Sequence, residues 1–411
     1  MTTRYWVGGT GAWSDTAHWA GKSGGVGGAS VPTAADDVRF DANSFSAAGQ
    51  TVTTDIEAAC HDLNWTGALH VPTFNVRGDL TIAGSLTLIP AMTVTAYALT
   101  TTITFTSSVS RSVTSAGHVW GGRYTFDGSG SWTLQDDLRS LGNWALNRGT
   151  FDANGKNVAA RIFSCNSGQT RTLKMGSGTW TLTPLETVSV WNFAAAGLTY
   201  DAGQSVVVLD STGSDAMHDF HMGGMNTHHS LTLKGSGKGL VRFRSTIGAW
   251  DWYGTLRVGG DFAGNVQIES ADGGTGRLDF TDYTGTFHVA APGYLFGITK
   301  FSPTMTFTQD YPVTFVDPGV CDLAGKVFTK AVTFDKANCT FQLRNFVCTD
   351  LVTLTRGTVV LESDVSSARF ASNNANVRTL TMGSYAWALT GSGLICDINS
   401  SLTYTVLRFR R

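Results

Sequence analysis

The chain of 411 residues carries a net charge of −2, with 29 basic and 31 acidic residues, so charge gives no basis for nucleic acid as its main partner. Only 15% of the residues are charged and 48 are glycine. A surface kept polar by Thr and Ser is typical of extended β architecture, because Thr suits a pleated, half-exposed strand. No apolar run approaches the roughly 18 residues of a membrane helix, so we expect no membrane insertion.

The first 45 residues differ from the rest of the chain. They contain Trp6, Trp13 and Trp19 and a Gly-rich stretch over 21–28. A β-solenoid has an open core and an unpaired strand edge at its first coil, and therefore needs a cap. We predict that residues 1–45 form this cap or an attachment segment. No apolar signal-peptide segment is present at the start, so we expect no cleavable leader.

Short segments in which apolar and polar residues alternate fill residues 46–411. Leu80–Ala83, Thr101–Thr106 and Leu231–Lys234 are examples, and Gly, Asn, Asp or Ser separates such segments. Alternation with period two predicts strands that bury one face. Helical spacing is not sustained anywhere, so the pattern predicts an all-β protein.

An internal repeat relates residues 124–183 to residues 332–390. In it, Arg171-Thr-Leu-Lys-Met-Gly-Ser recurs as Arg378-Thr-Leu-Thr-Met-Gly-Ser. Units of this kind leave an apolar face bare unless they stack on one another. We therefore predict a parallel β-solenoid (β-helix) with an aromatic- and Gly-rich N-terminal cap. An antiparallel sandwich or a propeller is the alternative, because the pattern does not show strand direction.

Two groups of acidic residues are candidates for catalysis: Asp36, Asp37 and Asp41, and the pair Asp136 and Asp137. Glycan hydrolysis needs two carboxylates that face each other across the scissile bond. Neighbouring residues of a strand point to opposite faces, so Asp36 and Asp37 cannot form such a pair by themselves. We expect turn and cap residues here, and the sequence predicts no catalytic residue.

The densest histidine group contains His218, His221, His228 and His229. Imidazoles at this density could hold a metal ion. However, the odd spacing of His218 and His221 places them on opposite faces of one strand. A surface loop or a contact between subunits is the interpretation that we favour, and we predict no metal and no cofactor.

The aromatic group Trp250, Trp252 and Tyr253 is the best candidate for ligand binding. Aromatic faces stack on sugars and anchor interfaces. Trp250 and Trp252 share one face of a strand, so they either stack in the core or are displayed outward.

Six cysteines lie far apart and form no Cys-x-x-Cys pair, which argues against a zinc site. They are Cys60, Cys165, Cys321, Cys339, Cys348 and Cys396. We expect free, mostly buried thiols, consistent with assembly in a reducing cytoplasm.

The opening Tyr5-Trp-Val-Gly-Gly-Thr-Gly-Ala-Trp-Ser-Asp and the later Asp37-Val-Arg-Phe-Asp-Ala resemble the start of large β-helical bacteriophage virion proteins. The Arg-Thr-Leu-x-Met-Gly-Ser repeats, and Met222-Gly-Gly before Ser230-Leu-Thr-Leu, look like the body of the same proteins. The passenger domains of autotransporter-type adhesins open similarly. The resemblance covers most of the chain and brings no catalytic residue with it.

This resemblance implies a non-enzymatic structural protein of a bacteriophage virion, which decorates the capsid or belongs to the tail or its fibres. Other virion proteins would be its partners, self-association commonly gives trimers, and assembly would take place in the host cytoplasm. The second hypothesis is a tailspike that recognises or degrades a host glycan, with Trp250, Trp252 and Tyr253 at its binding surface. The third is a bacterial surface adhesin, which would need an export route.

Overall fold

The computed structural model describes residues 2–96, 98–193, 196–221, 230–244, 250–259, 261–268, 273–290, 294–316, 319–405 and 407–411. The chain divides into two compact units, with residues 1–183 and 190–207 in unit 1 and residues 184–189 and 208–411 in unit 2. Both units consist of β-strands. Within the described ranges the only helical element is the 3-10 turn η1 (Thr16–His18).

Unit 1 contains the strands β1 (Thr2–Trp6), β2 (Gly11–Ala12), β3 (Trp19–Ala20), β4 (Asp36–Arg39), β5 (Thr51–Thr54), β6 (Ala58–Cys60), β7 (Leu63–Asn64), β8 (Thr73–Val76), β9 (Leu80–Ile82), β10 (Leu86–Thr87), β11 (Thr93–Ala96), β12 (Thr102–Phe105), β13 (Ser110–Thr114), β14 (Val119–Trp120), β15 (Arg123–Leu134), β16 (Leu138–Ser140), β17 (Trp144–Asp152), β18 (Val158–Ala160), β19 (Phe163–Cys165), β20 (Arg171–Lys174), β21 (Thr179–Leu182) and β23 (Leu198–Asp201). Two strands cross the boundary between the units in sequence, β22 (Val188–Phe193) and β24 (Val206–Asp210).

Unit 2 contains the strands β25 (His218–His221), β26 (Ser230–Lys234), β27 (Leu240–Arg244), β28 (Trp250–Val258), β29 (Asn265–Ile268), β30 (Gly273–Asp279), β31 (Thr286–Val289), β32 (Tyr294–Lys300), β33 (Thr306–Gln309), β34 (Val313–Phe315), β35 (Gly319–Asp322), β36 (Val327–Phe328), β37 (Val332–Arg344), β38 (Val347–Leu361), β39 (Val365–Ser372), β40 (Arg378–Thr381), β41 (Trp387–Leu389), β42 (Cys396–Ile398), β43 (Leu402–Thr405) and β44 (Phe409–Arg410).

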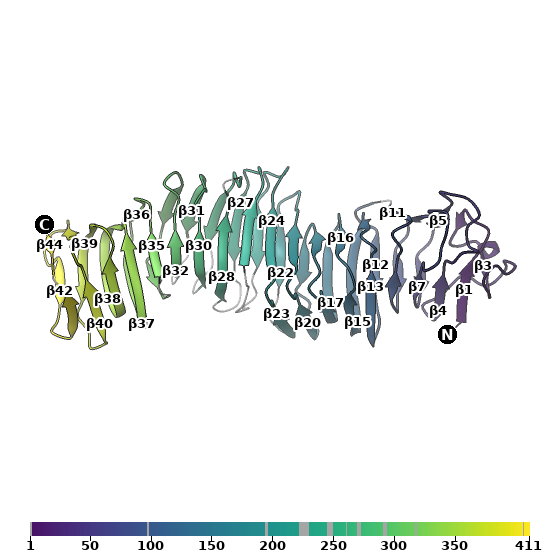
Figure 1. The fold of residues 1–411 in the computed structure, drawn as a ribbon, viewed down its shortest axis with the longest axis horizontal. Coiled ribbons are helices and arrows are strands. Elements are labelled where there is room, and N and C mark those ends of the chain that lie inside the picture. The colour runs from purple at the N-terminus through teal and green to yellow at the C-terminus, as the bar shows by residue number, and fades with distance from the viewer. Residues whose placement is uncertain are drawn as a thin grey trace. The chain divides into compact units, whose positions relative to one another are not determined.

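Within each unit the strands stack side by side as a parallel β-solenoid (Figure 1). In unit 1, Tyr124 lies opposite Trp144, and Trp144 lies opposite Phe163, so the chain returns to the same place after about twenty residues. In unit 2, β39 pairs with β41 and β42, and β40 pairs with β43, so one turn carries three strand segments. The predicted all-β parallel solenoid is confirmed.

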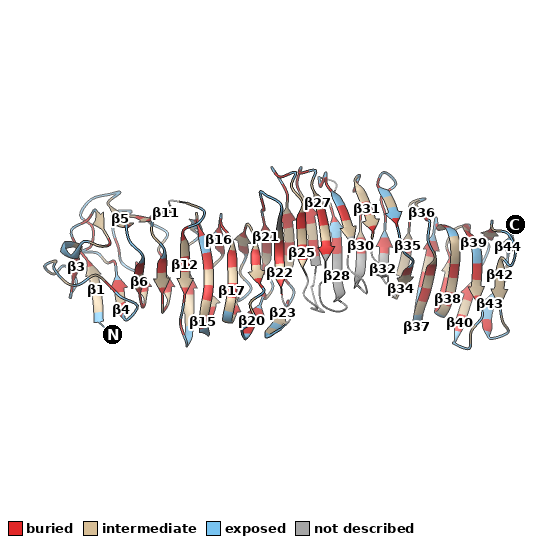
Figure 2. Cartoon of the chain, turned by 180° about the vertical axis from the view of Figure 1, so that it is seen from behind, coloured by how far each residue is buried: buried red, intermediate tan, exposed pale blue. Residues whose placement is uncertain are grey.

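Buried and more exposed residues alternate along strands of each unit (Figure 2). Along β15, Tyr124, Phe126, Trp132 and Leu134 are buried, while Thr125, Asp127 and Thr133 are more exposed. Aromatic rings from successive turns pack on one another, as Phe126 and Phe151 do with their ring centroids 4.7 Å apart. Burial of one large apolar side chain contributes roughly 1.5–3 kcal/mol, so these stacks are the main source of stability.

The first residues of unit 1 close its end with an antiparallel pair. In this pair, Trp6 of β1 lies opposite Trp19 of β3. The Trp19 ring contacts the rings of Trp6 and Trp13 edge-on, both with centroids 4.9 Å away. Strand β4 lies inside the predicted cap segment 1–45 and already pairs in parallel with β1 and β7, so the parallel ladder begins within that segment.

The two copies of the internal repeat occupy matching places in the two units. Gly149 in β17 and Gly357 in β38 both have positive φ, at +78° and +93°. A Cβ on Gly149 would lie 2.3 Å from the carbonyl oxygen of Gly128, so only glycine fits at this bend. Arg171 in β20 and Arg378 in β40 are both fully buried.

Candidate functional site

The predicted ligand-binding group begins strand β28. The backbone of β28 pairs in parallel with β30, with Trp250 opposite Gly273 and Trp252 opposite Thr275. The side chains of Trp250, Trp252 and Tyr253 lie outside the described part of the structure. Ligand binding by these three residues therefore stays a prediction.

The acidic residues of the N-terminal segment bind separate partners. The carboxylate of Asp36 accepts hydrogen bonds from the Thr33 main-chain N–H at 3.0 Å and the Thr33 hydroxyl at 2.9 Å. Burial by itself raises the pKa of Asp36, but these bonds and the Arg4 charge outweigh it, so the pKa is lowered. Asp37 instead accepts from His61. The two carboxylates are not brought together as a catalytic pair would require.

Asp136 and Asp137, which directly precede β16, accept hydrogen bonds from residues of neighbouring turns. Asp136 accepts from the main-chain N–H of Ser115 at 2.8 Å. Asp137 accepts from the main-chain and side-chain N–H groups of Asn157 at 2.9 and 3.0 Å. These bonds connect neighbouring turns of unit 1 and leave each carboxylate with a structural role.

The predicted histidine group is only partly described. His218 and His221 are the first and last residues of β25, whereas His228 and His229 lie outside the described residues. His218 is buried, and His221 lies 3.9 Å from the Asp219 carboxylate. The two described histidines therefore have different surroundings, which agrees with their odd spacing.

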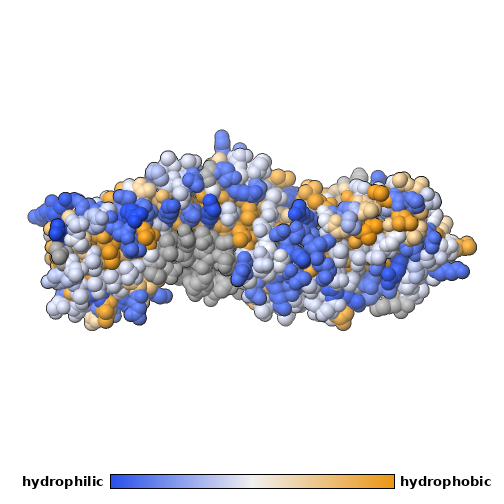
Figure 3. Space-filling model, viewed as in Figure 1, coloured by the Kyte–Doolittle hydropathy of each residue, from blue (hydrophilic) through white to orange (hydrophobic). Residues whose placement is uncertain are grey.

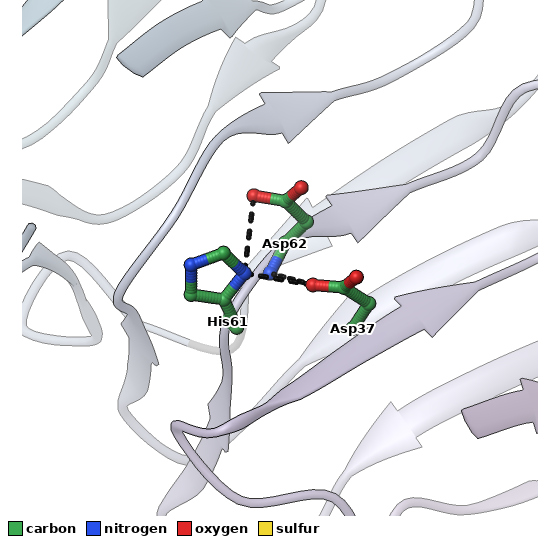
Figure 4. Close-up of side chains that lie close together, drawn as sticks. All are labelled: Asp37, His61 and Asp62. Atoms are coloured by element: carbon green, nitrogen blue, oxygen red, sulfur yellow. Dashed lines mark hydrogen bonds and ion pairs between the residues drawn. The ribbon is translucent and has the colours of Figure 1, made fainter. Parts of the chain in front are cut away.

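One cluster of ionisable side chains, which the sequence analysis did not predict, lies in unit 1 (Figure 4). Asp37 belongs to β4, and His61 and Asp62 follow β6 directly. Nδ1 of His61 lies 2.7 Å from Oδ1 of Asp37 and 3.6 Å from Oδ1 of Asp62. The His61 side chain is only 9% exposed, while both carboxylates reach solvent in part.

Arg111 of β13 completes this cluster on the other side of the ring. Its Nη2 lies 2.8 Å from Nε2 of His61, and its Nε donates to the Ser107 hydroxyl at 3.2 Å. A guanidinium can only donate, so Nε2 of His61 must accept. His61 is then the neutral tautomer that carries its proton on Nδ1 and donates it to Asp37.

This tautomer decides what the cluster can do. A metal ion bound to Nδ1 would move the ring proton to Nε2, where it would face the Arg111 donor. An Asp–His pair acts as a general base only when the second ring nitrogen is open to substrate, and here Arg111 covers that nitrogen. The arrangement instead clasps β4, β6 and β13 together across successive turns.

Solenoid geometry could in principle have indicated this clasp. Asp37 and His61 lie 24 residues apart, close to one turn, and His61 and Arg111 lie 50 residues apart, close to two turns. In the sequence, Asp37 is conspicuous only beside its neighbour Asp36. A search for His and Asp at turn spacing would have paired Asp37 with His61.

The described residues of unit 1 also enclose a cavity of about 10 Å³, which is room for one water molecule. It is lined by Phe74, Leu86, Leu88, Val94, Ile103, His118, Trp120 and Tyr124. This volume is too small for an organic ligand.

In the described part of the chain, no helix is long and apolar enough to cross a membrane.

Comparison with known proteins gives no relative for this chain. No protein-family model, no curated protein and no solved structure matches it.

Proposed function

We propose that this chain is a structural protein of a bacteriophage virion, which decorates the capsid or forms part of the tail or its fibres. The observation that carries the proposal is the continuous parallel ladder within each unit, with buried aromatic stacks along its interior. Within its strands, such a ladder pairs backbone N–H and C=O groups with those of neighbouring turns. It is therefore stiff and gives proteases few unpaired segments.

The outer surface supports contact with other proteins. Columns of hydroxyl side chains run from turn to turn along both units, and their members face outward on paired strands. The columns are Ser110, Ser131, Thr150, Thr172 and Thr199 in unit 1, and Thr340, Thr358, Thr379 and Thr403 in unit 2. On the face in Figure 3, hydrophobic residues occur in small areas among hydrophilic ones. An uncharged, regular strip of this kind packs against another β surface without like-charge repulsion.

The cysteines support assembly in a reducing compartment. All six are free thiols and five of them are buried. Small secreted domains usually contain disulfides, whereas cytoplasmic proteins keep their thiols reduced. A virion protein that assembles in the host cytoplasm would have this pattern.

The test is the composition and structure of native particles. Particles released from the producing cells are purified by density gradient, and the chain is sought by mass spectrometry and in cryo-electron microscopy density. The expected result is a constant number of copies at ordered positions on capsid or tail. Its absence from intact particles would contradict the proposal, and specific binding of the free protein to host cells or glycan would favour the tailspike hypothesis.

Charge variants test whether the hydroxyl columns make the contact. Thr172→Lys combined with Thr379→Lys places one charge in each column, and we expect fewer copies per particle. The matched control, Ser164→Lys combined with Ser366→Lys, adds the same charges to outward positions of other strand stacks. Equal loss of copies in both variants would contradict a role for the columns.

A further inference from the structure

His218 is a buried histidine whose ring meets, among the described residues, no side chain that binds it and only the main chain of Glu186. It begins β25, is 1% exposed and lies opposite Val241 of β27 in the parallel ladder. Phe220, two residues on, lies opposite Phe243, so this side of both strands faces the core of unit 2. Neither ring nitrogen of His218 has a partner of ordinary hydrogen-bond geometry, although the Glu186 main chain is close enough to raise the pKa of the ring.

The charged groups near His218 are already committed to other partners. Asp219 points to the opposite side of β25, where Arg242 of β27 binds it with two hydrogen bonds of 2.7 and 2.9 Å. His221 lies 3.9 Å from the same carboxylate. The main chain of Glu186 also acts on the ring, and no carboxylate forms an ion pair with His218 in the described part of unit 2. Among the described residues, a cation at this position would therefore be buried without an ion-pair partner of its own.

We propose that His218 makes unit 2 acid-sensitive, so that protonation of its ring in mildly acidic solution loosens the turn that contains β25 and β27. Burying an unpaired cation is far more costly than burying a neutral imidazole, so the cation forms only when the turn opens to water. The proposal is independent of the virion role.

The direction of the effect follows from proton binding. Burial lowers the pKa of His218 below its ordinary value of 6.5, while Asp219 and the Glu186 main chain offset part of this shift. Above pH 6.5 both the closed and the open turn hold a neutral ring, so the closed state keeps its full stability. Below pH 6.5 the open state binds a proton that the closed state does not, and opening becomes up to about tenfold more favourable per pH unit.

Hydrogen exchange of the full chain between pH 7.5 and 5.0 measures this opening. After correction for the intrinsic pH dependence of exchange, amides of β25 and β27 should lose protection below pH 6.5. Amides of β15 in unit 1 serve as the internal reference and should keep theirs. Unchanged protection of β25 and β27 down to pH 5.0 would overturn the proposal.

Two variants assign the effect to one ring. His218→Leu places an aliphatic side chain beside Val241 and should abolish the acid-induced loss of protection. The control is His288→Gln, which changes a partly exposed histidine of β31 that binds the Thr308 hydroxyl at 2.8 Å, and should leave the loss unchanged. If His218→Leu lost protection in acid as the parent does, His218 would not be the sensor.

A titration of the histidine rings in the parent protein tests the proposal at the ring itself. Selective ¹³C labelling of histidine rings resolves their signals by NMR, and His288→Gln and His218→Leu spectra assign two of them. The His218 signal should remain that of a neutral ring at pH values where exposed histidines have become charged. Titration of His218 together with the exposed histidines would refute the proposal.

Discussion

Replacing Arg378 tests how the buried repeat arginines stabilise the solenoid. Although Arg378 is fully buried, each of its hydrogen bonds in the structure goes to a neutral group. Its Nη1 donates to the carbonyl and to the hydroxyl of Ser372, its Nε donates to the Asn376 carbonyl at 3.0 Å, and its Nη2 donates to Oδ1 of Asn399 at 2.7 Å. One guanidinium therefore holds the bend between β39 and β40 and connects it to the next turn.

The substitution Arg378→Met keeps the length of the side chain and removes every donor. The carbonyls of Ser372 and Asn376 then lose their partner, at a cost of about 1–3 kcal/mol for each group. Relief of the buried charge returns part of this cost. We expect a net loss of about 2–4 kcal/mol in the free energy of unfolding of unit 2.

Urea unfolding followed by tryptophan fluorescence measures this loss, and hydrogen exchange of β40 and β43 locates it. Arg356→Met is the matched control, because Arg356 lies on the surface of the same unit in an exposed pair with Asp335. We expect little change for the control, since exposed ion pairs contribute little. Equal effects of both substitutions would refute the view that Arg378 acts through its buried hydrogen bonds.

Three further predictions concern unit 1 and the cysteines. Gly149→Ala should destabilise unit 1 by about 1–3 kcal/mol in thermal unfolding, because alanine is strained at φ +78° and its Cβ meets the Gly128 carbonyl; an unchanged midpoint would contradict this. Arg111→Leu should let Asp37, His61 and Asp62 bind Co²⁺, seen as new visible absorption, while the parent chain shows none; binding of Co²⁺ by the parent would contradict the blocking role of Arg111. Burial raises the pKa of the Cys165 and Cys348 thiols to about 11 and that of Cys321 to about 12. Cys396 is the one cysteine that is not buried, so a thiol reagent at pH 8 should label it first and the other five only after unfolding.

The sequence predicts the strands well because their alternation is a local property. In β15, the apolar residues Tyr124, Phe126, Trp132 and Leu134 are buried, as the alternation predicts. The internal repeat also places Gly149 and Gly357 at the same bend. Strand direction is not a local property, because it depends on which segments, about twenty residues apart, pair with each other. The long strands β37 and β38 also pass through a bend without a loop, since residues with positive φ, such as Asn338 and Gly357, turn the backbone within the strand.

The clasp of Asp37, His61 and Arg111 was not predicted because its members are brought together by the pitch of the solenoid. The turns of unit 1 vary in length: Leu63 pairs with Leu86, and Leu86 pairs with Val113. These offsets differ by several residues, so a fixed period in the sequence does not identify Arg111 as the partner of His61. Only the register of the ladder does.

Cross-turn ion pairs explain how so few charges can still specify this register. Asp127 pairs with Arg148 at 3.0 Å, and the equivalent residues of the second repeat, Asp335 and Arg356, pair in the same way. Exposed pairs of this kind contribute too little to stabilise the fold. A slip of one residue, however, would move every side chain of a strand to the opposite face and bury these charges. Their placement at the same point of both repeats therefore favours the correct register over its nearest competitor, while the buried aromatic stacks supply the stability.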